Sequence, residues 1–269
     1  MDDKTIEKLL KKSKLASAYE TLPSLEVRRA IAVEYGRLLR GNDLSNPMLT
    51  GHLKDSILPA VAFHRCLQEN GYTQAASLVV IRAAVLEAAK PMADFFQRLG
   101  RLPFFFPLFR ILCPISTKHS FGSEGWVFEW KRNDAHAIEW DCHACLYVDV
   151  FRRYNMPELA PIFCESDDVV YGKIPGIRWG RDQTIGGGDK LCNFCFYHIK
   201  KEALQNGTGK QMDSQGCDYN SIIDGASHRH SFCSYYCLYG KSIFQLRFIS
   251  WGINVFLCPG VHADGQQGK

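Results

Sequence analysis

The sequence predicts an α+β fold: a helical N-terminal half packed on a small antiparallel sheet, with a loosely ordered C-terminal extension. Residues 1–115 carry apolar side chains at helical spacing, whereas residues 122–200 contain short alternating segments typical of strands. Residues 201–269 are polar and turn-rich at first, then rich in cysteine and aromatic residues, without a sustained period. We therefore expect one α+β domain over residues 1–200, followed by an extension of uncertain structure.

The helical half divides at recognisable start and stop signals. A first amphipathic segment is indicated by four apolar residues: Leu9, Leu10, Leu15 and Tyr19. The next helix is predicted from an N-cap at Ser24 to a stop at Gly41. A third runs from a cap at Asp55 or Ser56 to Gly71.

The fourth segment has the clearest helical pattern, from a Thr73 cap to a break at Pro91.

His64 and Cys66 fall inside the third predicted helix. We expect both to be core or boundary residues rather than ligands, because single residues of these types on an apolar helix usually pack inside.

Two strand pairs are predicted in the second half. "WVFEW" and "AHAIEWDCHAC" alternate apolar and polar residues and are joined by a turn at residues 132–134. "GIRWGRDQT" and "LCNFCFYHI" form the second pair, connected through three consecutive glycines. Two helices, over 148–155 and 157–172, separate the pairs, and Pro157 opens the second of them.

Composition and charge exclude several classes of protein. The net charge of +4 comes from 32 basic and 28 acidic residues, too small an excess to predict nucleic-acid binding. Lys4–Lys14 is interpreted as the solvated face of a helix, with a membrane-surface role as the lesser alternative. The N-terminus lacks the apolar region of a signal peptide, and Leu102–Ile115 is too short to span a bilayer. We expect a cytoplasmic protein without a membrane or nucleic-acid partner.

Eleven cysteines in such a chain favour reduced thiols, catalytic groups or metal ligands over a disulfide framework. Cys142 and Cys145 form one C-x2-C pair, and Cys192 and Cys195 form another, so a four-thiolate zinc site is possible. On regular strands, however, a spacing of three points the two side chains to opposite faces. A third cluster of cysteine and histidine lies within residues 228–237.

The glycines of "TIGGGDK" do not form a phosphate-binding loop. Lys190 follows Asp189 and leads into a strand-like run, whereas a P-loop ends in Gly-Lys-Ser/Thr at the start of a helix. Gly186, Gly187 and Gly188 are better explained as residues that allow positive φ in the connection between two strands.

Cys164 is a candidate nucleophile because acids follow it at helical spacing. Asp167 and Asp168 share its helix face. A nearby carboxylate disfavours the thiolate, so Asp167 would move a proton or bind substrate rather than activate the thiol by charge. The alternative is a buried cysteine beside a surface acid.

Taken together, these segments resemble the L-2-amino-thiazoline-4-carboxylic acid hydrolase family. The resemblance covers residues 122–200, and the helical region before it carries no sharp motif of the family. It consists of a cysteine that ends a strand, a P-E-L segment, a C-x-x-D and a last block: Cys145, Pro157–Leu159, Cys164 with Asp167, then Arg181, Thr184, Gly188, Cys192 and Phe194. Asn193 departs from the family pattern, which has an acid there.

The resemblance implies a hydrolase of a small cyclic substrate. In the family's type reaction, water adds to the amidine carbon of 2-aminothiazoline-4-carboxylate and the ring opens to N-carbamoyl cysteine. Asp167 is then the candidate acid. The adding group is water or a thiolate, with Cys164 favoured over Cys145 and Cys192.

The same resemblance implies the substrate-binding residues. Arg181 would pair with the substrate carboxylate. Thr184 and the backbone at Gly188 would donate hydrogen bonds, and Asn193 would complete the set.

Two rival classes stay open. Cys145, Cys164, Cys192 and Asp167 could converge on one zinc ion, since thiolates with a carboxylate are a plausible ligand set. Alternatively the protein binds a small molecule and has lost activity, for which Asn193 is the one indication. The sequence requires no cofactor, assigns no metal ligand and leaves the oligomeric state open.

Overall fold

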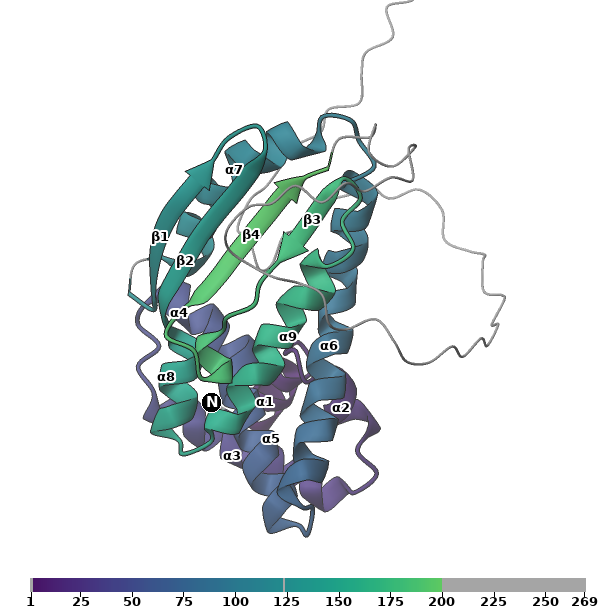
Figure 1. Ribbon diagram of the computed structural model, residues 1–269. Helices are drawn as coiled ribbons and strands as arrows, with labels where there is room; N and C mark the ends of the chain where they lie inside the picture. The colour runs from purple at the N-terminus through teal and green to yellow at the C-terminus, as the bar shows by residue number, and fades with distance from the viewer. Residues whose placement is uncertain (1, 123, 200–269) are drawn as a thin grey trace, which may run out of the picture. The chain divides into compact units, whose positions relative to one another are not determined.

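The computed structural model of the protein describes residues 2–122 and 124–199 and confirms the predicted α+β fold (Figure 1). The chain divides into the units Met1–Gln211 and Met212–Lys269, and the predicted extension and its cysteine cluster lie outside the described residues. The helical elements are α1 (Asp3–Leu10), α2 (Ala16–Thr21), α3 (Leu25–Gly41), α4 (Pro47–His52), η1 (Leu53–Ile57), α5 (Leu58–Glu69), α6 (Gln74–Leu99), α7 (Phe105–Phe121), α8 (Leu146–Arg153), η2 (Pro157–Leu159), α9 (Ala160–Tyr171) and η3 (Ile185–Gly187).

The sheet is antiparallel and four-stranded in the order β1-β2-β4-β3. Its strands are β1 (Trp126–Asn133), β2 (Ala137–Cys145), β3 (Ile177–Gly180) and β4 (Cys192–His198). Both predicted strand pairs are therefore confirmed. Asp134 closes the β1–β2 turn by accepting hydrogen bonds from the backbone N–H groups of His136 and Ala137.

The two faces of the sheet differ in chemistry. Trp140 and Cys142 of β2 pair with Phe194 and Cys192 of β4, so all four side chains share one face. Helices α6 and α7 lie behind that face in Figure 1. The opposite face, toward the viewer, carries charged residues such as Glu129, and Cys195 shares it.

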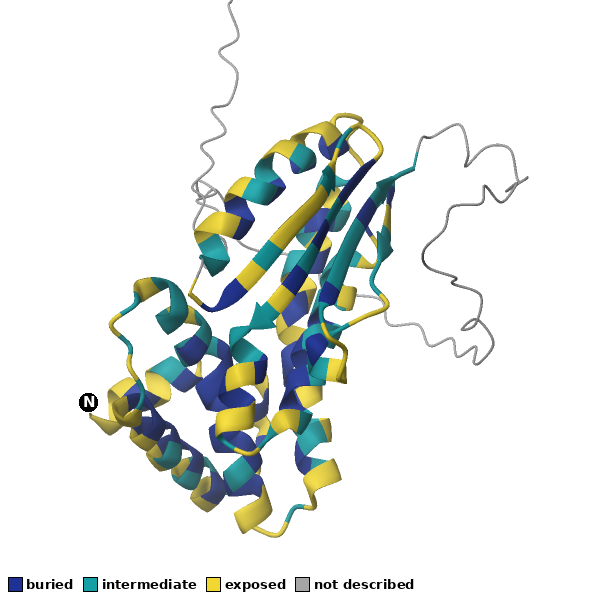
Figure 2. Ribbon diagram, turned by 60° about the vertical axis from the view of Figure 1, so that its left-hand side comes forward, coloured by how far each residue is buried: buried dark blue, intermediate teal, exposed yellow. Residues whose placement is uncertain are grey.

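Two hydrophobic clusters form the core. The larger joins α1–α5, the first half of α6, α8 and α9, and it extends to Cys142 and Cys192 at one end of the sheet. The smaller is aromatic: Phe96, Phe109, Trp140 and Phe196 pack where the last turns of α6 and the first half of α7 cover the strands. Figure 2 shows buried residues concentrated where the helices meet each other and the sheet.

The helix start signals were predicted well and the breaks less well. Ser24 and Thr73 cap α3 and α6, each accepting a hydrogen bond from a backbone N–H three residues on. The break predicted at Pro91 is wrong, because α6 continues to Leu99. Pro91 is exposed, so the carbonyl that loses its partner can bond to water while the turns beyond pack on the sheet.

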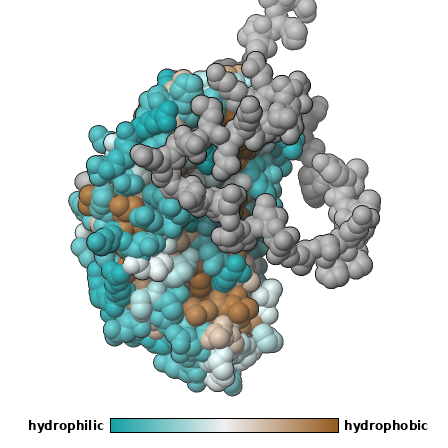
Figure 3. Space-filling model, viewed as in Figure 1, coloured by the Kyte–Doolittle hydropathy of each residue, from teal (hydrophilic) through white to brown (hydrophobic). Residues whose placement is uncertain are grey.

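The start predicted at Asp55 or Ser56 is also wrong. The helical run begins at Pro47, where Asn46 provides the cap, and passes through the π-helical turn η1. The first predicted segment is instead two short helices, α1 and α2, separated at residues 11–15. Figure 3 shows a largely hydrophilic surface with hydrophobic side chains gathered in a few places. None of the described helices has the length and apolar character needed to cross a bilayer.

Candidate active site

Residues from separate parts of the chain converge where β2 ends and β4 begins, next to α8 and α9 (Figure 1). Cys145 ends β2 and precedes α8, Cys192 begins β4, and Cys164 and Asp167 lie on one face of α9. The structure places these four predicted residues near enough for the charge of Asp167 to affect the pKa of each thiol.

Asp167 is held by Arg181. The Nη1 of Arg181 donates to Oδ2 of Asp167 at 2.8 Å, and its Nη2 donates to the carbonyl of Cys164 at 2.6 Å and pairs with Asp168 at 2.9 Å. Burial raises the pKa of Asp167, while the charges of Arg181 and Lys14 oppose the shift. The side chain is still 37% exposed, so the carboxylate can meet a ligand.

Arg181 has no comparable access. Its side chain is 3% exposed and lies over the rings of Trp179 and Phe194, 5.6 and 5.7 Å from their centroids. Asp167, Asp168 and the carbonyl of Cys164 already surround its guanidinium. Arg181 therefore fixes the position of the Asp167 carboxylate and of α9. The structure therefore gives no support to the expected contact between Arg181 and a substrate carboxylate.

The thiol of Cys145 lies at the N-terminus of α8. Burial raises its pKa to about 11, and the backbone N–H groups of Val148 and Tyr147 oppose that shift by hydrogen bonding to the sulfur. A helix N-terminus favours negative charge, because its first N–H groups have no partner inside the helix. Of the three predicted thiols, Cys145 is the one that accepts two backbone hydrogen bonds.

Cys164 has less favourable surroundings. Burial raises its pKa to about 12, the carboxylate of Asp167 adds to the shift, and Arg181 opposes it. Its sulfur also lies under the glycine loop, where a Cβ on Gly186 would stand 2.8 Å from it. For Cys192, burial also raises the pKa, and the N–H of Ile185, 3.2 Å from the sulfur, opposes the rise.

The glycine loop folds differently from the expectation. Among Gly186, Gly187 and Gly188, Gly188 alone has a positive φ, +108°. Gly186 is required by its close approach to Cys164 and to Ala160 of α9. A Cβ on Gly187 would lie 2.7 Å from the hydroxyl of Thr184. The prediction of positive φ is thus wrong for two of the three positions.

Thr184 and Gly188 use their backbone donors inside this loop. The Thr184 hydroxyl accepts from Gly187 N–H at 3.0 Å, and its own N–H donates to Asp189 Oδ2 at 2.7 Å. The N–H of Gly188 donates to the carbonyl of Ile185 at 3.2 Å. Their substrate contacts stay predictions, and the observed bonds fix the loop over Cys164 and Cys192.

Asn193 supports the same loop from the other face of the sheet. Its Oδ1 accepts from the N–H groups of Asp182 and Gln183, at 3.1 and 2.9 Å, and its Nδ2 donates to the Asp182 carboxylate. These bonds position the segment that follows Arg181. An acid at position 193 would keep both acceptor bonds but would face a second carboxylate.

Lys14 is a member of the site that the sequence did not indicate. It follows α1, its backbone N–H donates to the carbonyl of Asp55 at 2.7 Å, and its Nζ lies 5.9 Å from the ring centroid of Phe163. Burial lowers its pKa, and Asp167 and Asp55 oppose that shift. Among the described residues, none of the carboxylates pairs with it directly.

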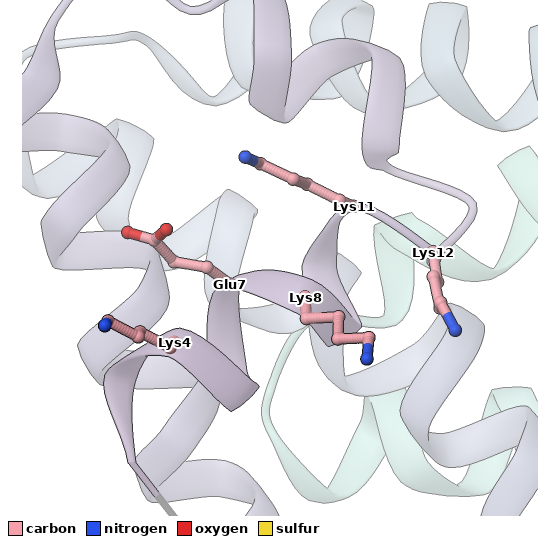
Figure 4. A pocket seen from close by; sticks show the side chains of 5 residues that line it. All are labelled: Lys4, Glu7, Lys8, Lys11 and Lys12. Atoms are coloured by element: carbon pink, nitrogen blue, oxygen red, sulfur yellow. The ribbon is translucent and has the colours of Figure 1, made fainter.

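The interpretation of Lys4–Lys14 as a solvated face is wrong at its last residue. Lys14 ends a run of exposed lysines, and no local sequence pattern distinguishes it from them. Figure 4 shows those lysines around a hollow beside α1, lined by Lys4, Glu7, Lys8, Lys11 and Lys12. All five side chains are exposed, so this hollow is solvated surface rather than a built site.

A polar chain reaches the site from its apolar side. The hydroxyl of Tyr147 and Nδ1 of His52 are 3.1 Å apart, and Nε2 of His52 is 3.0 Å from the carbonyl of Ser120. Since a carbonyl can only accept, Nε2 carries the proton and Tyr147 donates to Nδ1. Burial lowers the pKa of His52 and raises that of Tyr147. The π-helical turn η1 brings Ser56 to Tyr147.

The side-chain group with a spacing suited to a metal ion lies away from the cysteine cluster, among the described residues. Among residues 2–122 and 124–199, one group places three such ligand atoms within 4.8 Å of one another, namely Glu129, Asp141 and His143 on the polar face of the sheet. Lys131 already forms ion pairs with both acids of this group, Glu129 and Asp141. The cysteine cluster does not form such a group, so the structure adds no support to the zinc hypothesis.

Comparison with known proteins gives a consistent result. The sequence model of one family, L-2-amino-thiazoline-4-carboxylic acid hydrolase, matches residues 52–196, more than half of the 269-residue chain. Searches of curated proteins and of solved structures return no significant match. The matched range contains every predicted site residue, and Lys14 lies before it. The protein belongs to the L-2-amino-thiazoline-4-carboxylic acid hydrolase family.

Proposed function

We propose that the protein hydrolyses a small cyclic amidine that bears a carboxylate, by a reaction that resembles thiazoline ring opening. The observation that carries this proposal is the convergence of three thiols on the Asp167 carboxylate, with Arg181 and Lys14 as nearby cations. An amidine needs a proton donor and an adding group at one carbon, and this cluster supplies both kinds of group.

Asp167 moves the protons. Its raised pKa brings proton uptake nearer to neutral pH than for an ordinary aspartate, and Arg181 fixes one of its oxygens. A protonated amidine nitrogen makes the neighbouring carbon more electrophilic. The same carboxylate takes the proton of the adding thiol, whose pKa its charge already affects.

Cys145 is the proposed nucleophile. Its sulfur attacks the amidine carbon while Asp167 takes the thiol proton, and the tetrahedral species expels the ring sulfur, which receives that proton. The product of this step is an isothiourea on Cys145. Water then adds to the same carbon, Cys145 leaves as a thiol, and an N-carbamoyl aminothiol is released. Atoms and protons balance over the two steps, with one water consumed.

Lys14 binds the substrate carboxylate. Its ammonium lies in the field of Asp167 without a direct ion pair to a described carboxylate. Burial disfavours the charged form of Lys14, and a substrate anion beside the ammonium would offset that cost. Arg181 is already surrounded by acceptors and nearly inaccessible. This assigns the carboxylate to the N-terminal segment of the chain.

The central test is replacement of the acid. Asp167→Asn in the full chain should lower the rate of thiol release from 2-aminothiazoline-4-carboxylate by about 10²–10⁴-fold, because proton transfer at the reacting carbon is lost. Glu165→Gln is the matched control, since Glu165 lies on α9 but pairs with Arg82. An unchanged rate in Asp167→Asn would contradict the proposal.

The nucleophile is tested by trapping. Rapidly quenched wild-type protein should carry the isothiourea adduct on the peptide that contains Cys145, as measured by mass spectrometry. Cys145→Ala should lose both adduct and turnover, whereas Cys195→Ala, altered on the opposite sheet face, should keep them. Turnover that survives in Cys145→Ala would transfer the role to Cys164, Cys192 or water.

The substrate contact is tested with two substrates. Lys14→Met should raise KM for 2-aminothiazoline-4-carboxylate and leave KM for 2-aminothiazoline, which lacks the carboxylate, unchanged. KM is the readout rather than kcat, because the charge of Lys14 also acts on the pKa of Asp167. Lys12→Met, altered at an exposed lysine, should affect neither. Equal effects of Lys14→Met on both substrates would indicate a structural role instead.

A further inference from the structure

Helix α7 is apolar on both of its faces. The inward side chains of Phe105, Phe106, Phe109 and Cys113 are buried. Its outward side should be polar in an ordinary surface helix. Instead, Phe104, Leu108, Ile111 and Ile115 are 56, 42, 59 and 57% exposed. We call these four residues the α7 stripe.

The spacing of the α7 stripe places its members on one line. Leu108, Ile111 and Ile115 are spaced by three and four residues, so they lie on one side of α7 over about 10 Å at 1.5 Å per residue, and Phe104 is the residue just before the helix begins. Other large exposed apolar residues, such as Val33 on α3 and Val79 on α6, belong to no such row. A contiguous row of this kind marks an interaction surface, whereas single exposed residues do not.

The charged residues of the segment that carries the α7 stripe are all basic. Residues 95–122 contain Arg98, Arg101, Arg110 and Lys118 and no Asp or Glu. Arg98, Arg101 and Lys118 are exposed. This distribution complements an anionic surface.

We propose that α7 is an interfacial helix that docks the protein on an anionic lipid surface. An apolar face flanked by basic residues is the arrangement that binds in the plane of a bilayer, with its side chains at the headgroup boundary. The four residues enter the lipid while Arg101 and Lys118, before and after the stripe, meet the phosphate groups. This proposal differs from the expectation of no membrane partner, and it does not depend on the proposed chemistry.

A second copy of the chain is the competing occupant. Two α7 stripes packed face to face would bring basic residues of both copies together without acidic residues in the same segment to balance them. An anionic bilayer provides that balance, so the charges favour lipid over self-association.

Vesicle binding of the full chain tests the proposal. The protein should co-sediment with vesicles of phosphatidylglycerol and phosphatidylcholine, and more weakly with vesicles of phosphatidylcholine alone. Ile111→Ser/Ile115→Ser should lower the partition coefficient about tenfold. Val33→Ser/Val79→Ser, which removes equally exposed side chains elsewhere, should leave it unchanged. Circular dichroism checks that each variant folds.

The electrostatic part has its own variant. Arg101→Gln/Lys118→Gln should weaken binding to the anionic vesicles by about fivefold per charge, with no effect on neutral ones. Binding that is absent, or equal in the stripe variant and its control, overturns the proposal. A dimer in lipid-free solution that Ile111→Ser/Ile115→Ser converts to a monomer also overturns it and assigns the α7 stripe to a second copy.

Discussion

The same face of strands β2 and β4 serves two different purposes within a few residues. At one end, Trp140 and Phe196 stack at 5.4 Å within the aromatic cluster under α6 and α7. At the other, Cys192 pairs with Cys142 across the strands and lies beside Arg181 and Ile185 of the loop over α9. The strands are continuous, so the helices and loops packed on them determine the difference. The aromatic end buries apolar rings, which stabilises the fold. The cysteine end keeps charged side chains in a largely buried place, and their desolvation costs stability.

The largest expected effect on stability is at the aromatic end. Phe196 is 1% exposed and contacts rings of Phe109, Trp140, Tyr171 and Trp179. Phe196→Ala should lower the free energy of unfolding by about 3–5 kcal/mol, measured by urea denaturation. Phe104→Ala, the same change at an exposed position, should cost far less. Similar costs would show that the aromatic cluster is not the stabilising region.

A smaller effect is expected where the loop covers Cys164. Gly186→Ala places a Cβ 2.8 Å from the sulfur and 3.2 Å from the backbone of Ala160. We expect a loss of about 1–3 kcal/mol from overpacking, together with faster alkylation of Cys164 as the loop moves away. Gly41→Ala is the control, because its Cβ meets nothing within 4 Å. Unchanged stability and alkylation in Gly186→Ala would mean that the loop does not seal this thiol.

Position 193 should respond in a pH-dependent way. Asn193→Ala removes the acceptor of two backbone N–H groups and should cost about 1–3 kcal/mol. Asn193→Asp keeps the acceptor but faces Asp182, so repulsion raises the pKa of one carboxyl in the folded state. Its deficit relative to wild type should therefore be full at neutral pH and shrink as the pH falls through that raised pKa. A deficit independent of pH would exclude repulsion as the cause.

The smallest expected effect comes from His52. Burial lowers its pKa, so below its ordinary pKa of about 6.5 the unfolded chain binds more protons than the folded one. The free energy of unfolding should then decrease as the pH is lowered below about 6.5, by at most about 1.4 kcal/mol per pH unit for one proton. His52→Gln should flatten this slope, whereas His119→Gln, at an exposed position, should not. Equal slopes in both variants would assign the pH dependence to other groups.

Local sequence predicted elements whose signals are local. Ser24 and Thr73 identified helix starts because a capping side chain bonds within three residues. The alternation in "AHAIEWDCHAC" identified β2, and the spacing of Cys192 and Cys195 correctly separated them onto opposite faces. Pro91 gave a wrong break because packing beyond it outweighs the loss of one hydrogen bond.

The site was predicted as a set of residues, and its internal roles required the structure. Cys145, Cys164, Asp167 and Cys192 were named from an ordered motif, and their charges affect one another in the structure. Arg181 was also named, but its partners within the site could not be read from the order of residues. Lys14 had no motif at all, because its burial arises from α9 and η1 packing around it.

The sequence by itself determined the fold class, the strand pairs and the membership of a hydrolase family, because periodicity, caps and ordered motifs are properties of neighbouring residues. The tertiary structure decided that Arg181 holds Asp167, that Cys145 lies at a helix N-terminus, and that Lys14 turns inward. Each of these depends on burial and on charges contributed by distant segments. Desolvation and Coulomb energies are set by three-dimensional surroundings, and no local pattern encodes them.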